Sequence, residues 1–429
     1  MLSNKYFLLG ILTLIGVLNF LDRQIMSILL EPIKQDLGFS DSQLGLLTGI
    51  YFALVYSLIG IPVARLADRW HRGKIISVSL FFWSAMTVVS GWAGSFVHMA
   101  LARVGVGIGE AGVAPAAHSL ISERFDSKSR ASALAFYSLG GTTGIILALF
   151  GGGWMSQNFG WRATFFAAGV PGLIFAIFAF ILIRETRTIE PLSTKLFKAK
   201  EGQRSIFGAL AFLLRNKSWR FAAIATSLTH IGTYGIGNWM PSYIVRSYGL
   251  SQYETGLLLA GVIGVCGSIG AMSGGIVAER VAARRGVGWL AWTLGVAFLL
   301  ASILGAFAFT ATNLVTFVAL VSPFFLLILT SSGVQFAIAQ VTVTPDMRAM
   351  SSALLILMIN LIGLGLGPPI VGALSDWFSA SFGAGNQSLR YAMICVMPLL
   401  VAGAFYFWKA GHALGSDAID DSVAGDSAR

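Results

Sequence analysis

Apolar runs of about twenty residues recur from one end of the chain to the other, and this feature limits the possible folds more than any other. An α-helix rises about 1.5 Å per residue, so such a run crosses the ~30 Å hydrocarbon core of a bilayer. The alternating short strands typical of a membrane-spanning barrel do not occur in the sequence. The pattern therefore predicts an all-α membrane protein that crosses the bilayer many times.

The composition agrees with a chain that lies mostly in lipid. Of its 429 residues, 56% are hydrophobic and 11% are charged, whereas about 25% of the residues in soluble domains are charged. The net charge of +10 does not indicate nucleic-acid binding, because nearly all basic residues lie between the apolar runs. The two cysteines, Cys266 and Cys395, fall in apolar runs and predict neither a disulfide framework nor a metal site.

We predict twelve membrane spans, which the longest polar interval separates into two sets of six. The spans are 6–30, 42–64, 75–95, 98–119, 130–154, 162–183, 219–241, 252–277, 287–309, 313–340, 348–374 and 389–410. The predicted domains are an N-terminal six-helix half at 1–184, a basic cytoplasmic linker at 185–217, a C-terminal six-helix half at 218–411 and a disordered cytoplasmic tail at 412–429. Two six-helix halves of this kind are typical of secondary transporters.

The distribution of lysine and arginine predicts the orientation of the chain. If both termini are cytoplasmic, only four basic residues lie on the outer side, namely Lys34, Arg162, Arg246 and Arg390. The opposite orientation would place most basic residues outside, against the positive-inside rule. We therefore expect a multi-pass protein of a cell membrane with both termini in the cytoplasm.

Two charged residues interrupt the fourth span. Arg103 and Glu110 are seven residues apart, nearly two helical turns, so both side chains project from the same helix face. A charge in hydrocarbon costs at least ~2.5–3.5 kcal/mol, and such residues normally face a bundle interior or a water-filled cavity. Glycines 105, 107 and 109 lie between them and allow close approach of neighbouring helices. This face predicts a binding site or a pathway.

Asp22 and Arg23 stand in the outer part of the first span, and the helical rise places Asp22 at about the depth of Arg103. We predict a switchable network in which Arg103 pairs with Asp22 or with Glu110. The two carboxylates would carry protons, because a buried carboxylate without a partner retains a proton readily. Arg103 and Arg23 would contact the substrate. The alternatives are a static ion pair between the two spans and an Arg23 side chain that extends to the outer interface.

A weak internal repeat relates the sequences of the two halves. The turn after the second span carries Asp68, Arg69, Arg72 and Lys74, and the turn after the eighth span carries Glu279 and Arg280, again followed by a basic and glycine-containing cluster. We interpret these charges as a gating latch that holds one conformation without binding substrate. The alternative is that they only set the topology.

The seventh span carries polar and aromatic residues at helical spacing. His230, Tyr234 and Asn238 could contact the substrate from the second half, or the aromatic residues could belong to an interfacial belt. The sequence contains no phosphate-binding loop, no cluster of metal ligands and no pairing of a nucleophile with a base. We therefore predict no enzyme activity, no cofactor and no nucleic-acid partner.

The turn from Ala64 to Lys74 resembles the cytoplasmic loop signature of the major facilitator superfamily, with Ala64 and His71 at positions where glycine is usual. A narrower likeness covers Asn19-Phe-Leu-Asp22-Arg23-Gln and Arg103-Val-Gly-Val-Gly-Ile-Gly-Glu110-Ala. These stretches resemble the Spinster-like branch, whose eukaryotic members move sphingosine 1-phosphate and lysophospholipids. The resemblance implies twelve helices in two pseudo-symmetric halves, and the short loops are typical of a bacterial member in the inner membrane.

Together these features predict a secondary active transporter that works by alternating access and couples to protons. The resemblance implies an amphipathic lipid substrate, such as a lysophospholipid or a sphingosine-phosphate-like molecule. A proton symporter of small organic anions such as sugar acids is the alternative, because a buried arginine binds a carboxylate equally well. A non-transporting membrane receptor is a more distant one. The expected partners are the small amphipathic or anionic substrate, protons and membrane lipid, and we expect a monomer.

Overall fold

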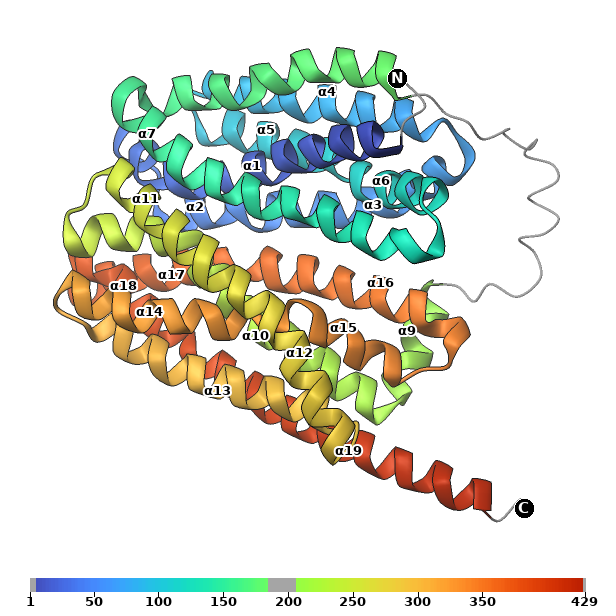
Figure 1. Cartoon of the computed structure of the whole chain (residues 1–429). Coiled ribbons are helices and arrows are strands. Elements are labelled where there is room, and N and C mark those ends of the chain that lie inside the picture. The colour runs from blue at the N-terminus through green and yellow to red at the C-terminus, as the bar shows by residue number, and fades with distance from the viewer. Residues whose placement is uncertain (1–4, 184–205, 427–429) are drawn as a thin grey trace. The chain divides into compact units, whose positions relative to one another are not determined.

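A computed structural model describes residues 5–183 and 206–426, and every regular element within these residues is helical (Figure 1). Ten helical stretches are long and apolar enough to cross a membrane. One of them, Lys128–Leu182, contains two predicted spans, and α10 (Lys217–Tyr248) provides another span whose polar residues lower its mean hydropathy. The predicted all-α membrane fold with twelve spans is therefore confirmed.

The helices fall into two compact units. The first unit comprises Met1–Gly202 and Asn238–Gly261, and the second comprises Gln203–Gly237 and Val262–Arg429. The predicted boundaries of the linker and the tail stay predictions. Residues 184–205, which make up most of the linker, lie outside the described residues, and the last helix continues through Asp426, into the predicted tail.

Among the described residues, the first unit contains seven complete helices and parts of two more. These are α1 (Lys5–Leu37), α2 (Asp41–Thr48), α3 (Ile50–Arg69), α4 (Arg72–Gly91), α5 (Phe96–Glu110), α6 (Val113–Arg124), α7 (Ser127–Leu182), the end of α10 and most of α11 (Gln252–Val262). The second predicted span is formed by α2 and α3, which are separated at Gly49, and the fourth span is formed by α5 and α6.

Helix α7 is a 56-residue element that contains a break at Gly160. The φ angle of Gly160 is 82°, which glycine adopts at no steric cost, and the helix changes direction there. The break separates the predicted spans 130–154 and 162–183. The residues after the break are fastened to α1, because Trp161 donates a hydrogen bond of 3.1 Å to Asp36 and Arg162 forms an ion pair with the same carboxylate.

Small residues bring α1 and α7 into close contact, and the two helices lie side by side (Figure 1). A Cβ atom added to Gly140 would lie 2.7 Å from the carbonyl oxygen of Thr13, and one added to Gly144 would collide with the carbonyl of Val17. The spacing of these glycines is the small-xxx-small pattern that packs membrane helices. Helix α1, which carries Asp22 and Arg23, is thereby held in a fixed register.

The second unit contains two short π-helical segments. Its elements are α9 (Ile206–Arg215), the first part of α10, η1 (Ile263–Gly267), α12 (Ser268–Arg285), α13 (Trp289–Thr310), α14 (Leu314–Leu329), α15 (Ser331–Val341), η2 (Pro345–Met347), α16 (Arg348–Met358), η3 (Ile359–Leu364), α17 (Gly365–Phe382), η4 (Gly385–Gln387), α18 (Ser388–Cys395) and α19 (Met397–Asp426). The π-helices are η1, directly before α12, and η3, between α16 and α17.

A buried tryptophan joins three helices of this unit. Trp219 of α10 is fully buried and donates a hydrogen bond of 2.8 Å to the hydroxyl of Ser351 in α16. That hydroxyl in turn donates to the carbonyl of Ala339 in α15, at 2.6 Å. The chain of hydrogen bonds satisfies the indole and the hydroxyl inside an apolar cluster, as buried polar groups require.

Candidate functional site

The three glycines of α5 let two neighbouring helices press against it. A Cβ atom added to Gly109 would lie 2.7 Å from the backbone nitrogen of Trp83 in α4, and one on Gly105 would collide with Met86 of the same helix. Gly107 faces α3 instead, because an added Cβ would lie 3.0 Å from the carbonyl oxygen of Phe52. These contacts fix the rotation of α5, and the two charged residues Arg103 and Glu110 are both buried.

Glu110 forms an ion pair with Arg23 of α1. Its Oε2 atom accepts hydrogen bonds from Nη2 of Arg23 at 2.7 Å and from Nε at 3.2 Å. The guanidinium also lies 4.9 Å from the ring centres of both Phe52 and Tyr56, within the range of cation–π contacts. The partner of Glu110 in this conformation is thus Arg23, where the sequence analysis considered Arg103.

Asp22 and Arg103 are buried near each other without a close ion pair. Their side chains are 1% and 3% exposed, and within the described residues no ion pair within 4.0 Å joins them. Among the residues that the structure describes, Oδ1 of Asp22 has no hydrogen-bond partner, and neither do Nε and Nη2 of Arg103. Arg103 nevertheless lies within electrostatic range of the carboxylates of Asp22 and Glu110. Buried charges left in this way usually mark a functional site.

A cavity of about 220 Å³ lies against the Arg23–Glu110 pair, and we call it the first-unit cavity. Its lining comes from α1, α3, α5, α6 and α7, namely Gly16, Asn19, Phe20, Arg23, Tyr56, Glu110, Val113, Ala114, His118, Tyr137, Ser138 and Gly141. The rings of His118 and Tyr137 meet edge to face with their centres 5.4 Å apart. The cavity therefore combines a charged pair, aromatic rings and neutral polar groups.

Sequence reasoning missed His118, Tyr137 and Asn19 as lining residues. A helical signal for two of them exists, because His118 follows Glu110 by eight residues and Asn19 precedes Arg23 by four. In a continuous helix, as the sequence predicts for each span, each would project toward about the same side as a charged residue that the sequence analysis selected. No comparable signal exists for Tyr137, which reaches the cavity from α7.

A second group of buried charges in the first unit centres on Arg246. Its Nε donates to Glu31 at 2.8 Å, and its two terminal nitrogens donate to Asp41 at 2.7 and 2.8 Å. Lys34 also pairs with Asp41, at 2.5 Å. Burial alone would lower the pKa of Arg246, but the hydrogen bonds and charge of Asp41, with help from Glu31, raise it above its usual value. Sequence reasoning counted Lys34 and Arg246 only as topology signals and did not find this group, which we call the Arg246 cluster.

The residues of the predicted latch have different surroundings. Arg72 is buried, donates to the hydroxyl of Ser119 at 2.8 Å and forms an ion pair with Glu123, both on α6. Lys74 is exposed on α4, and Glu279 and Arg280 are exposed on α12. The side chains of Asp68 and Arg69 lie outside the described residues. The gating role of this set stays a prediction.

The candidates of the seventh span lie on α10. His230 donates through Nδ1 to the carbonyl of Thr226 at 2.8 Å, and its ring centre lies 5.8 Å from that of Tyr234. Both residues belong to the second unit and are half-buried. Asn238 belongs to the first unit, where its Oδ1 is buried and has no hydrogen-bond partner among the described residues. Their contact with a substrate stays a prediction.

Many membrane-spanning helices with a few charged side chains buried among them are the features of a secondary transporter. The sequence profile of the Major Facilitator Superfamily matches residues 12–364, so the chain belongs to this family. Members of the family are transporters, which confirms the prediction that the chain is not an enzyme. The family also confirms the predicted major facilitator fold.

Known proteins of similar length agree with this assignment. A crystal structure of a bacterial homologue of the human lysosomal transporter Spinster, inward-facing and occupied, matches with a TM-score of 0.84 and 28% identity over 96% of this chain and 98% of that chain. An MFS-type efflux pump of Mycolicibacterium smegmatis is 32% identical over 96% of this chain and 94% of the relative. A hexuronate transporter of Bacillus subtilis is 27% identical over 90% and 92%. The likeness to the Spinster branch is confirmed.

Proposed function

We propose that this protein is a proton-coupled secondary transporter of an anionic amphipathic molecule, of the lysophospholipid or sphingosine-phosphate class. The observation that carries the proposal is the group of four charged residues in the helical core of the first unit, Asp22, Arg23, Arg103 and Glu110, three of them buried and one half-buried. A scaffold would be more stable with apolar residues at these places, since buried ion pairs seldom add stability. A role in moving protons or a charged substrate explains why charged residues occupy these positions.

The Arg23–Glu110 pair gives a route for coupling. An anionic headgroup that enters the first-unit cavity competes with Glu110 for Arg23, because guanidinium groups bind phosphate and carboxylate through paired hydrogen bonds. Glu110 is buried, so it takes up a proton when it loses its partner. Asp22 and Arg103 are the second acid and base of this group. Because Arg103 interacts electrostatically with both Asp22 and Glu110, protonation of Glu110 also affects Asp22.

The first-unit cavity has the size of a headgroup. Its volume of about 220 Å³ is below the ~300–1,000 Å³ typical of sites for drug-sized ligands, so an acyl chain would have to lie outside it. Aromatic rings from Phe20, Tyr56 and Tyr137 give apolar contact next to the charged pair. The similarity to a sphingosine-1-phosphate transporter of Xenopus tropicalis supports a lipid. A transported hexuronate would fill the cavity alone, and the similarity to a hexuronate transporter keeps this alternative open.

We further propose that the protein acts as a monomer in the inner membrane of a bacterium, with both termini in the cytoplasm. The distribution of basic residues supports this orientation. The buried Arg72, which connects the start of α4 to α6 through Ser119 and Glu123, supports a cytoplasmic latch. Release of this latch would accompany alternating access, in which one half rocks against the other.

The test is transport in proteoliposomes that contain a pH-sensitive dye. A labelled lysophospholipid and a labelled hexuronate are compared, each with and without a proton gradient. Each substrate is placed either inside or outside the vesicles, so that both directions of transport are measured. The controls are protein-free vesicles and the Asp126→Asn variant, which removes an exposed carboxylate of the same unit.

We expect gradient-dependent movement of the lysophospholipid, accompanied by proton flux. Selective movement of the hexuronate would replace the lipid by the small organic anion and keep the coupling proposal. Binding of either molecule without movement across the membrane would indicate a receptor and would overturn the proposal.

A further inference from the structure

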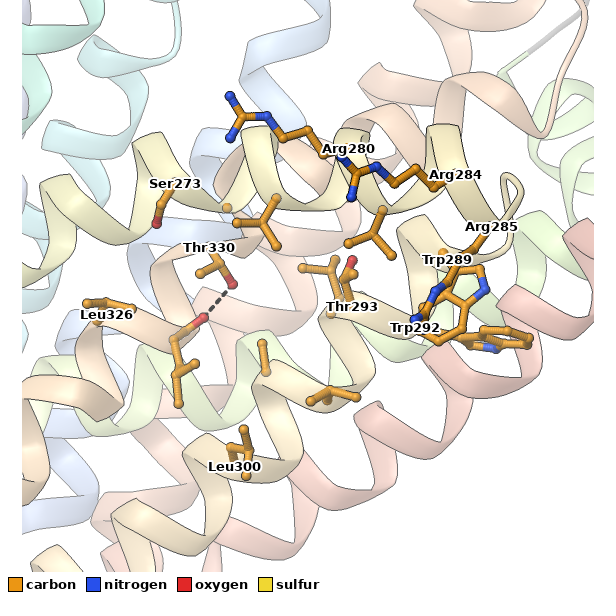
Figure 2. Close-up of a pocket in the computed structure, with 17 residues that line it drawn as sticks. Ser273, Arg280, Arg284, Arg285, Trp289, Trp292, Thr293, Leu300, Leu326 and Thr330 are labelled. Atoms are coloured by element: carbon orange, nitrogen blue, oxygen red, sulfur yellow. Dashed lines mark hydrogen bonds between the residues drawn. The ribbon is translucent and has the colours of Figure 1, made fainter.

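The second unit contains a groove of about 850 Å³, and none of the buried charged residues described above lines it. Figure 2 shows the residues that line the groove. It lies between α12 and α13, with the end of α14 and Thr330 at its base, and we call it the α12–α13 groove. The volume lies in the ~300–1,000 Å³ range of known ligand sites. None of the residues selected for transport lines it except Arg280, to which the sequence analysis gave a gating role.

Three arginines line the groove along its α12 side (Figure 2). Arg280 and Arg284 are one helical turn apart on α12, and their side chains extend in the same direction along the helix (Figure 2). Arg285 follows directly, and its guanidinium carbon lies 4.8 Å from the ring centre of Trp289. All three are exposed, and within the residues that the structure describes none of them forms an ion pair with a carboxylate. The groove therefore presents uncompensated positive charge.

Two tryptophans gather at the end of the groove where Arg285 lies, next to the turn between α12 and α13 (Figure 2). Trp289 and Trp292 meet edge to face with their ring centres 5.0 Å apart. Trp292 is held in place because its indole nitrogen donates to the carbonyl of Trp408 at 3.0 Å. Tryptophans prefer the level of the lipid headgroups, so this end of the groove lies at a membrane interface.

The rest of the groove is apolar and open to the surroundings. Val277, Val296 and Leu300 line it and are 47–56% exposed. Its base is closed by close packing, because a Cβ atom added to Gly274 would lie 2.5 Å from the carbonyl oxygen of Thr330. An exposed apolar groove that is lined by three arginines on one side and has two tryptophans at one end is complementary to a molecule with an acyl chain and an anionic headgroup.

We propose that the α12–α13 groove is a binding site for an anionic phospholipid of the surrounding membrane, with phosphatidylglycerol as the simplest representative. The phosphate contacts Arg280, Arg284 and Arg285, and the glycerol backbone lies beside Trp289 and Trp292. One acyl chain runs along Val277 and Leu300. Basic pockets between membrane helices on the cytoplasmic side select anionic headgroups in this way. The site binds a resident lipid and does not require that the transported substrate be a lipid.

The test is photo-crosslinking of the full chain in phosphatidylcholine vesicles that contain a minor fraction of phosphatidylglycerol. A trace of phosphatidylglycerol with a photoreactive acyl chain is compared with phosphatidylcholine that carries the same chain, and labelled peptides are mapped by mass spectrometry. We expect labelling between Ser273 and Leu300 to be several times stronger with phosphatidylglycerol. Water-soluble glycerol phosphate in excess should not compete, because it lacks the acyl chain.

Two variants separate headgroup charge from groove shape. The triple variant Arg280→Gln, Arg284→Gln, Arg285→Gln should lower labelling by phosphatidylglycerol about tenfold and leave labelling by phosphatidylcholine unchanged. Val277→Trp places a bulky ring in the groove and should lower labelling by both lipids. The matched control removes three exposed basic residues elsewhere, Lys128→Gln, Arg130→Gln, Arg348→Gln, and should have no effect at this site.

Equal labelling by the two lipids in the wild-type protein would overturn the proposal, and so would a triple variant that labels like the wild type. Either result would show that any membrane lipid covers the groove without selection for its headgroup. Circular dichroism and a melting curve for each variant establish that it is folded. Since the readout is labelling and not transport, it is independent of the outcome of the proteoliposome experiment.

Discussion

The two units differ in the kind of polar group that they bury. Among the residues that the structure describes, all buried charged side chains lie in the first unit, namely Asp22, Glu31, Asp41, Arg72, Arg103, Glu110 and Arg246. The buried polar side chains described for the second unit are hydroxyls and one amide, that of Gln335. One half of the protein therefore contains the groups that can gain or lose charge in the interior.

Several hydroxyls of the second unit are satisfied within their own helices. Ser227 donates to the carbonyl of Ala223 at 2.8 Å, and Thr229 donates to that of Ala225 at 2.9 Å. Such bonds to the preceding helical turn need no partner from another helix. The charged groups of the first unit depend on partners from other helices, such as Arg23 for Glu110, so their state can change when those helices move. The proton coupling that we propose therefore belongs to the first unit.

The largest expected effect comes from Glu110→Gln. This change keeps the shape of the side chain but removes the carboxyl group that we propose exchanges a proton. Gradient-driven transport should then fall by on the order of 100-fold, as when a proton-transferring group is removed from an enzyme. The measurement is proton-coupled uptake in proteoliposomes, with expression and melting temperature as controls for folding. Wild-type coupling in this variant would remove Glu110 from the proton pathway.

The largest loss of stability is expected from removal of Arg103. Arg103→Ala leaves the buried carboxylate of Asp22 without its nearby positive charge, and an uncompensated buried charge costs about 3–5 kcal/mol. Adding Asp22→Asn should restore part of this loss, with a coupling free energy of about 0.5–3 kcal/mol in a double-mutant cycle. The measurement is unfolding in detergent. Strict additivity of the two changes would show that these residues do not form one network.

A smaller effect is expected from the Arg246 cluster. Arg246→Gln removes the cation between Glu31 and Asp41, and we expect a loss of about 1–3 kcal/mol because charged acceptors remain buried. Arg162→Gln is the matched control, since its ion pair with Asp36 is exposed and such pairs contribute about 0–1 kcal/mol. Both are measured as shifts in melting temperature. Equal shifts would show that burial of the cluster adds nothing.

The smallest effect is expected in the second unit. Gln335→Leu replaces an amide whose oxygen has no hydrogen-bond partner among the described residues, and its stability should change by no more than about 1 kcal/mol. The ratio of protons to substrate should stay as in the wild type, because this side chain carries no charge. A change in that ratio, measured with the same vesicles, would contradict the division of roles between the units.

The spans could be predicted because apolar length and helical rise determine them directly. Even the break in α7 agrees with the predicted interval between spans, since Gly160 lies in the gap between 154 and 162. The partner of Glu110 could not be predicted in this way. Helical rise gives the depth of a residue, but Asp22 and Arg23 differ by about 100° around the helix axis, and only packing decides which of them faces Glu110.

Contacts between residues that are distant in sequence could not be predicted either. Arg246 and Asp41 are separated by 205 residues, and the rule that identified Arg246 counts charges without pairing them. Tyr137 contributes to the first-unit cavity from α7, although an aromatic residue in an apolar run is normally interpreted as packing. The charged residues themselves could be selected because a charge within an apolar run is costly wherever it points.

The π-helical segments of the second unit have a consequence for backbone dynamics. A π-turn closes its hydrogen bonds over one residue more than an α-turn, so each of η1 and η3 contains a residue that the regular helix cannot accommodate. Amides near such an insertion open more easily than those of the flanking turns, and deuterium should enter there first. The surplus residue also sets the angular phase of the next helix. If the π-turn of η1 were removed, every side chain of α12, including Arg280, would point about 100° away from its present direction.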